Sequence, residues 1–173
     1  RAFLGHGASV IVNYLNSGTA AEQLAHEAPG RALAIQADVS DASAVAKMIE
    51  QVEQHFKKRV TTVVNNALPA FQFNGDARPH ADALSWGDLH QQFEGVVRGA
   101  LNTVQAALPG MREKEFGRVI NIGTSLFQNP VVPYHDYTAA KAALLSLTRT
   151  LSQDLGPSGI TVNMVSGGLL RTT

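Results

Sequence analysis

The chain has 173 residues, 45% of them hydrophobic and 16% charged, which is enough for one compact domain with a hydrophobic core. Fourteen basic and fourteen acidic residues give a formal net charge of zero, which argues against a surface that binds nucleic acid or acidic lipid. There is no cysteine, so disulfides and thiolate metal sites are excluded, and no apolar run approaches the ~18 residues that a membrane span needs.

The first residues are typical of the end of a helix. Gly5 and Gly7 follow a short apolar run in the manner of a glycine stop, and no initiator Met precedes it. At the other end, residues 170–173 come shortly after the pair Gly167-Gly168. We therefore expect that the chain lacks segments at both ends.

Apolar and amphipathic runs alternate over the first 64 residues. Short β-branched and apolar runs predict strands at 8–14, 31–37 and 60–64. Between them, patterns with helical periodicity predict helices at 20–28, ended by Pro29-Gly30, and at 42–57, capped by Ser40-Asp41.

The alternation continues after a polar loop at 69–83. A long helix is expected from Ser85 to Leu108, where Pro109-Gly110 would end it, followed by a polar segment at 111–116. The remaining predictions are a strand at 117–123, a loop at 124–135, a helix from 136 to 155, a strand at 160–165 and a turn at 166–168.

Strands that alternate with helices predict an α/β fold with a doubly wound parallel sheet, in a single domain of residues 1–173. The strands are short apolar runs, as expected where helices cover both faces of a sheet. Ligands of such sheets bind outside the carboxyl ends of the strands. That rule places Asp38-Val39 and residues 65–67, 123–125 and 166–168 on one rim, to which the start of the helix at 136 returns.

Tyr137 and Lys141 lie four residues apart on that helix and therefore share one face. A cation beside a phenol favours the phenolate and lowers its pKa, so such a tyrosine can exchange protons near neutral pH. The spacing alone is more typical of an ordinary surface pair. The rest of the chain decides between the two interpretations.

Several motifs in order resemble the short-chain dehydrogenase/reductase family over the whole chain. They are Asp38-Val39 after a strand, Val64-Asn65-Asn66-Ala67, the run 117–124, Tyr137-x-x-x-Lys141 and Ile160-Thr161-Val162-Asn163. Within the family the chain looks most like 3-oxoacyl-(acyl-carrier-protein) reductases. The resemblance implies a Rossmann-type fold, here without its first strand, glycine-rich phosphate loop and C-terminal end, and a nicotinamide cofactor.

The resemblance also implies roles for individual residues. Tyr137 would protonate the substrate carbonyl oxygen, Lys141 would lower the tyrosine pKa and bind the nicotinamide ribose, and Thr124 would donate a hydrogen bond to the carbonyl. The residues implied in cofactor binding are Asn13, Asp38, Val39, Asn65, Ala67, Tyr137, Lys141, Gly168 and Thr172.

Two positions depart from the family pattern. Thr124 stands where serine is usual, which keeps the hydroxyl and adds a methyl group. Val96 stands where an asparagine normally holds a water of the proton relay, while Asn102, one or two turns away, is interpreted as an ordinary helix residue. These departures put the relay in question and leave the Tyr137–Lys141 pair intact.

The resemblance therefore predicts a reductase that converts a ketone, here a 3-oxoacyl thioester on acyl carrier protein or coenzyme A, to a secondary alcohol. Asn13-Tyr14 provides neutral groups where an acidic residue would repel a 2′-phosphate, so NADP is expected and NAD is the alternative. The rival hypothesis is a catalytically impaired nucleotide-binding or scaffold protein on the same fold. We expect a cytoplasmic homodimer or homotetramer without a metal, since the six histidines show no ligand spacing.

Two features keep two interpretations each, and a third has one. Asp38 either lies at the adenine or only caps the following turn. Phe71, Phe73 and Phe127 either cover an acyl substrate or pack their loops onto the body of the protein. Tyr134, with no lysine four residues on, is a poorer acid than Tyr137 and is interpreted as a pocket wall.

Overall fold

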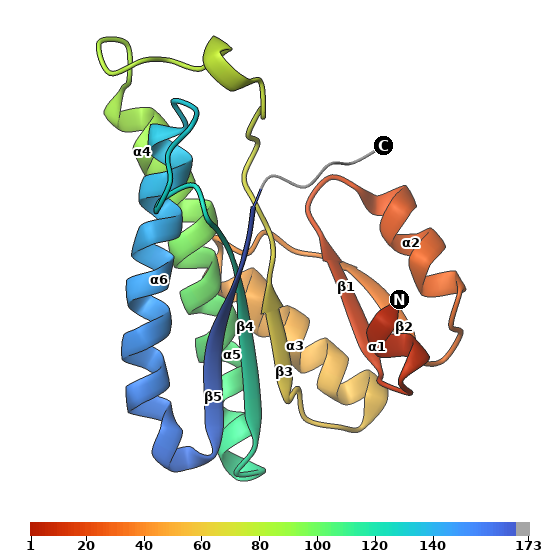
Figure 1. Cartoon of the computed structure of the whole chain (residues 1–173). Helices are drawn as coiled ribbons and strands as arrows, with labels where there is room; N and C mark the ends of the chain where they lie inside the picture. Colours follow the sequence, from red (N-terminus) through yellow and green to blue (C-terminus); the bar gives the residue numbers. More distant parts are fainter. Residues whose placement is uncertain (169–173) are drawn as a thin grey trace.

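The structure is a computed structural model that describes residues 1–168, and strands and helices alternate along this part of the chain (Figure 1). The strands are β1 Val10–Tyr14, β2 Ala32–Gln36, β3 Thr62–Asn65, β4 Gly117–Thr124 and β5 Ile160–Gly167. The α-helices are α1 Ala2–Gly5, α2 Gly18–His26, α3 Ala42–Phe56, α4 Trp86–Phe93, α5 Gly99–Glu113 and α6 His135–Leu155. A π-helical segment, η2 Glu94–Arg98, joins α4 to α5, and short 3₁₀ turns lie at η1 Gly75–Ala77 and η3 Gly156–Ser158.

All strand pairings in the described residues are parallel, which confirms the predicted α/β class. β1 pairs with β2, and β4 lies between β3 and β5. No strand of residues 1–168 lies between β1 and β3 (Figure 1), which agrees with the expected Rossmann-type sheet without its first strand. The two facing edges instead border a cavity of about 570 Å³.

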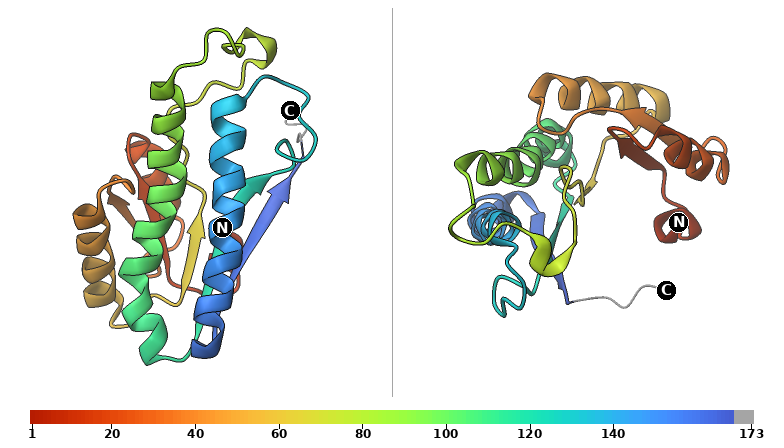
Figure 2. Two further views of the ribbon diagram at one scale, coloured as in Figure 1. Left: turned by 90° about the vertical axis from the view of Figure 1, so that its left-hand side faces the viewer. Right: turned by 90° about the horizontal axis from the view of Figure 1, so that it is seen from above.

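The β3–β4–β5 sheet is covered on one face only, within the described residues. α5 and α6 pack on that face (Figure 2), where Val63, Val119 and Val162 are buried. On the opposite face Val64 and Val165 are 43% and 56% exposed. Within residues 1–168 helices thus cover one face of this sheet, whereas the β1–β2 pair lies between α2 and α3 (Figure 2).

The main core joins α3 and α5 to both sheets. The apolar face predicted for residues 42–57 is confirmed, since Val45, Met48, Ile49 and Val52 are buried in that core. α3 begins where Asp41 accepts hydrogen bonds from the backbone N–H groups of two following residues, so the predicted cap is also confirmed.

The end predicted for the long helix is wrong. α5 continues through Pro109 to Glu113, and Met111, assigned to a polar segment, is fully buried in the main core. A proline inside a helix removes one hydrogen bond and crowds the preceding turn. We infer that burial of the turn around Met111 offsets this cost.

β5 also extends further than predicted, to Gly167, because Ser166 and Gly167 pair with Gly123 and Thr124 of β4.

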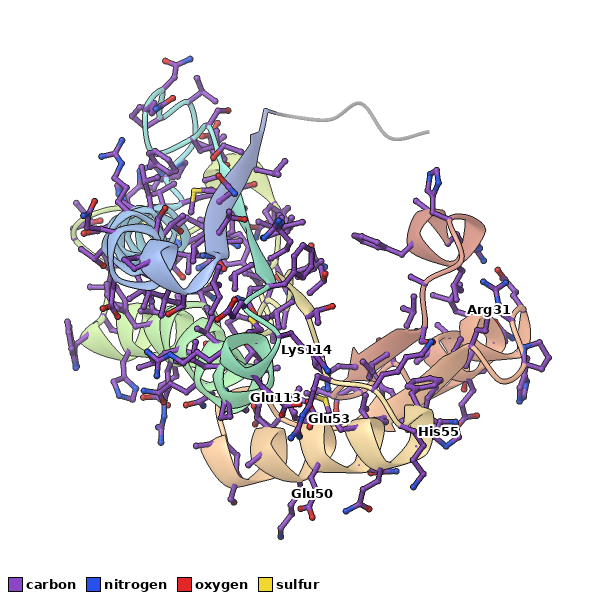
Figure 3. The ribbon with its side chains drawn as sticks, turned by 90° about the horizontal axis from the view of Figure 1, so that it is seen from below. Arg31, Glu50, Glu53, His55, Glu113 and Lys114 are labelled. Carbon is purple, nitrogen blue, oxygen red and sulfur yellow. The ribbon has the colours of Figure 1, made fainter. Side chains whose placement is uncertain are left out.

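The amino-terminal end of the sheet, opposite the candidate site, carries an exposed ion-pair group. There Arg59 contacts Glu53 of α3 at 2.7 Å and Glu113 of α5 at 2.6 Å; Figure 3 labels both glutamates. Exposed pairs of this kind contribute little stability.

Candidate active site

Tyr137 and Lys141 lie on the first turns of α6, where the helix starts at the carboxyl end of β4 (Figure 1). Both side chains are buried, and the Lys141 Nζ atom is 5.7 Å from the centre of the Tyr137 ring. The same Nζ donates a hydrogen bond of 2.5 Å to the Ile122 carbonyl of β4. Thr124, the last residue of β4, is buried, and its side chain is close enough to Tyr137 to influence the ionisation of the phenol. The structure thus brings the three predicted catalytic residues together.

Burial dominates the ionisation of this group. It raises the pKa of Tyr137 above 10.0, and the nearby Thr124 side chain offsets only part of that change. The expected lowering of the tyrosine pKa by Lys141 stays a prediction, because burial has the largest effect on that pKa in this structure. Burial also lowers the pKa of Lys141 from 10.5 to about 8. At neutral pH the phenol is protonated, as a proton donor must be, and the amine is still mostly charged.

The cavity between β1 and β3 is lined by five of the predicted cofactor-binding residues: Asn13, Val39, Asn65, Ala67 and Lys141. Much of its lining, which includes residues of β1, β3 and α3, surrounds the position of the first strand in a Rossmann-type order, so the volume of about 570 Å³ is not that of a ligand site alone. It joins the end of the first sheet to the buried face of α6. Four further residues predicted to bind the cofactor therefore border the same space as the predicted catalytic lysine.

The remaining predicted residues lie elsewhere. Asp38 is exposed, and its carboxylate accepts hydrogen bonds of 2.8 and 2.7 Å from the backbone and hydroxyl of Ser40, the geometry of the capping alternative. Gly168 is exposed beside Ser125. Thr172 lies outside the described residues.

Asn65 takes part in a chain of side-chain hydrogen bonds. Its Oδ1 accepts from the Thr103 hydroxyl at 2.6 Å, and its Nδ2 donates to Asn121 Oδ1 at 2.8 Å. Asn121 in turn donates to the Thr148 hydroxyl at 2.8 Å, and that hydroxyl donates to the Leu144 carbonyl at 2.7 Å. The chain ties β3 to β4, α5 and α6, as expected for an asparagine that joins neighbouring strands.

Two polar residues hold the cavity wall in place. Asn13 donates from Nδ2 to the Ala37 carbonyl at 2.9 Å. Asn102, interpreted from the sequence as an ordinary helix residue, is buried and donates to the Val39 carbonyl at 2.8 Å. Sequence reasoning missed this role. The available signal was an amide among apolar neighbours of a helix, a position that is costly unless hydrogen-bonded.

Val96 lies in the π-helical segment η2 and is buried against Ala100, Ala140 and Leu144. Segments of this type often mark functional sites. Here the side chain at its centre is apolar and provides no hydrogen-bonding group for a water.

Comparisons with known proteins agree with this geometry. A family profile described as enoyl-(acyl carrier protein) reductase matches residues 1–173. Versicolorin reductase stcU of Emericella nidulans is 32% identical over 170 residues, covering 96% of this chain and 61% of that protein. The 3-oxoacyl-[acyl-carrier-protein] reductase FabG of Staphylococcus aureus is also 32% identical, covering 95% of this chain and 65% of that protein.

The fold comparison gives the same result. A crystal structure of a short-chain dehydrogenase from Streptomyces avermitilis superposes with a TM-score of 0.84 at 30% identity, covering 99% of this chain and 61% of that one. The chain belongs to the short-chain dehydrogenase/reductase family. Its sequence is similar to the 3-oxoacyl reductases among these relatives, and it spans about three fifths of the length of the relatives it matches.

Residues 1–168 contain no cluster of His, Cys, Asp or Glu that could hold a metal ion. None of the described helices combines the length and apolar character needed to span a membrane.

Proposed function

We propose that the full-length protein is an NADPH-dependent reductase that converts a ketone, in particular a 3-oxoacyl thioester, to a secondary alcohol. The observation that carries this proposal is the buried group of Tyr137, Thr124 and Lys141 at the end of β4. Relatives named as 3-oxoacyl-[acyl-carrier-protein] reductases support the choice of substrate class.

Each residue has a distinct task in the reduction. As negative charge develops on the ketone oxygen, the protonated Tyr137 donates its proton, and the Thr124 hydroxyl donates a second hydrogen bond to the same oxygen. The buried ammonium of Lys141 stabilises the phenolate that remains after proton transfer, since opposite charges in a site of low dielectric attract strongly.

The end of the cavity that lies at the carboxyl ends of β1 and β3 is the proposed site for a nicotinamide dinucleotide. Asn13, Val39, Asn65 and Ala67 would hold its adenosine half, and Lys141 and Gly168 its nicotinamide half. When bound, the cofactor supplies the hydride. The neutral Asn13 favours NADP because it carries no charge that would repel a 2′-phosphate, and Thr172 completes the proposed set.

The test is reduction of an acetoacetyl thioester by the full-length protein, followed by the loss of NADPH absorbance. Tyr137→Phe should lower kcat by about 10²–10⁴-fold, the usual contribution of a positioned acid, without changing the NADPH dissociation constant. A Tyr137→Phe protein that turns over at the original rate would refute the proposed acid.

Val96 favours a second candidate, a catalytically impaired nucleotide-binding or scaffold protein. Its buried apolar side chain replaces the amide expected in a proton relay. The same assay separates the two functions, because this candidate predicts that the unsubstituted protein binds NADPH and reduces no ketone.

The proposed domain organisation, oligomeric state and location of the protein follow from its likeness to the family. We propose one domain for residues 1–173, a homodimer or homotetramer, and a cytoplasmic location. Acyl carrier protein or coenzyme A would carry the thioester. Sedimentation of the full-length protein would test the oligomeric state directly.

A further inference from the structure

The loop between β3 and α4 passes over the carboxyl end of the sheet, beside the first turn of α6 (Figures 1 and 2). It is attached there at two points. Arg78 forms an ion pair of 2.6 Å with Asp136. The backbone N–H of Gly75 donates to the Tyr134 hydroxyl at 2.8 Å. Both partners belong to the start of α6, next to Tyr137.

The ion pair is largely removed from solvent. The Asp136 side chain is 4% exposed and that of Arg78 is 17% exposed. A buried carboxylate is costly without a cation, so the loop residue that neutralises Asp136 is strongly constrained in position. The Arg78 guanidinium also lies 4.4 Å above the centre of the Phe71 ring, a cation–π contact.

Phe71 and Phe73 pack directly on the proposed acid. The Phe71 ring lies 5.0 Å from the Tyr137 ring at 33°, and Phe73 lies 5.6 Å from it at 80°. Phe71 also makes an edge contact of 5.2 Å with Tyr134. Asp136, Arg78 and Phe71 thus form a continuous series of contacts that ends on Tyr137.

Phe73 differs from Phe71 in exposure. It is 61% exposed although it touches the buried Tyr137 ring, whereas Phe71 is half-buried. A large exposed aromatic side chain beside a catalytic group is apolar surface available to a ligand. A ketone whose oxygen meets the Tyr137 hydroxyl lies close enough for an acyl chain of several carbons to reach Phe73.

We propose that Phe71 and Phe73 form the apolar wall that selects ketones bearing a longer acyl chain, and that Arg78 positions this wall by its ion pair with Asp136. The assignment rests on the proposed ketone reductase function and adds the determinant of chain length. It adopts the substrate-contact alternative for these two phenylalanines. The Phe71 ring packs against Tyr137, and the exposed Phe73 ring contacts the acyl chain of the substrate.

The first test compares acetoacetyl and 3-oxooctanoyl thioesters of coenzyme A in the full-length protein. Phe73→Ala should lower kcat/KM for the longer substrate about tenfold through KM, because the wall binds ground state and transition state alike. The value for acetoacetyl should stay within about twofold. Phe116→Ala is the matched control, since this exposed phenylalanine precedes β4 at the opposite end of the sheet.

The second test addresses Arg78 without relying on activity. Arg78→Gln removes the charge that holds the loop, so chymotrypsin should cut after Phe71 and Phe73 at least fivefold faster, as read by mass spectrometry. Arg78→Lys keeps the charge but loses the planar guanidinium, so its cleavage rate should lie between those of the wild-type and Arg78→Gln proteins. Arg98→Gln, which breaks an exposed ion pair with Glu94, is the control for loss of a surface arginine.

The outcomes separate this inference from the function on which it rests. A wild-type protein that reduces neither thioester refutes the proposed function and the wall together. A protein that reduces both, with the same preference for chain length before and after Phe73→Ala, refutes the wall alone. Equal cleavage of wild-type and Arg78→Gln proteins refutes the positioning role of Arg78.

Discussion

Thr148→Val tests the buried hydrogen-bond chain that links α6 to the strands. Thr148 is 4% exposed, and its hydroxyl accepts a hydrogen bond of 2.8 Å from Asn121 Nδ2, which is itself 1% exposed. Valine has nearly the shape of threonine, so the substitution leaves no cavity but removes the acceptor of that amide. A buried donor left without its partner costs about 1–3 kcal/mol. We therefore expect the free energy of unfolding to fall by about 2 kcal/mol.

Thr150→Val provides the matched control on the same helix. The Thr150 hydroxyl also donates to a carbonyl one turn back, that of Ser146 at 3.3 Å, but the side chain is exposed. Changes in helix propensity and in this local hydrogen bond are therefore similar in both variants. The difference between them isolates the cost of leaving the Asn121 amide unpaired.

Urea unfolding of the full-length protein, followed by circular dichroism, measures this difference. The slope of free energy against urea should be the same for both variants, so that the midpoints compare stability alone. If Thr148→Val loses no more than about 0.5 kcal/mol beyond Thr150→Val, then the hydrogen-bond chain does not stabilise the fold as inferred.

Three further predictions concern the site and its supports. In the absence of cofactor, the stability of the wild-type protein relative to Lys141→Met should rise between about pH 8 and pH 10.5. In this range the Lys141 amine of the unfolded chain binds a proton that the folded chain lacks. A stability difference that stays constant in urea titrations across this range would contradict the lowered pKa of Lys141. Gly99→Ala should lower the free energy of unfolding by about 1–3 kcal/mol in thermal or urea unfolding, since the added Cβ atom would lie 2.7 Å from Val39 Cγ2. The Cβ atom of the control variant Gly156→Ala meets open space, so this variant should keep its stability. Asp41→Ala should cost about 1 kcal/mol by loss of the α3 cap, and Asp41→Asn should restore most of it in the same assay.

Local patterns predicted most of the elements in this chain. The helical period of Val45, Met48, Ile49 and Val52 identified α3, and the short β-branched runs identified the strands. Pro109 misled this reasoning, because helix propensity is a local quantity and the burial of Met111 is not. The boundary of α5 therefore needed the packing of the whole domain.

The candidate site shows the same division. The spacing of Tyr137 and Lys141 places them on one helix face, and the family motifs identified them as the catalytic pair. The rule for parallel sheets placed Asn65 and Thr124 at the same edge. The raised pKa of Tyr137 did not follow, since desolvation depends on what covers the phenol. The roles of Asn102 and Arg78 likewise depend on partners far away in the sequence, at Val39 and Asp136.

The sequence by itself determined the alternation of elements, the parallel sheet class and the family, because each depends on periodicity or on short motifs. Only the tertiary structure decided which residues line the space between β1 and β3 and which side chains of the β3–β4–β5 sheet are buried in residues 1–168. The tertiary structure also decided that the loop between β3 and α4, whose sequence has no clear periodicity, lies beside Tyr137. Pairing, burial and ion pairs arise between segments distant in sequence, and their energies are fixed only when the chain is folded.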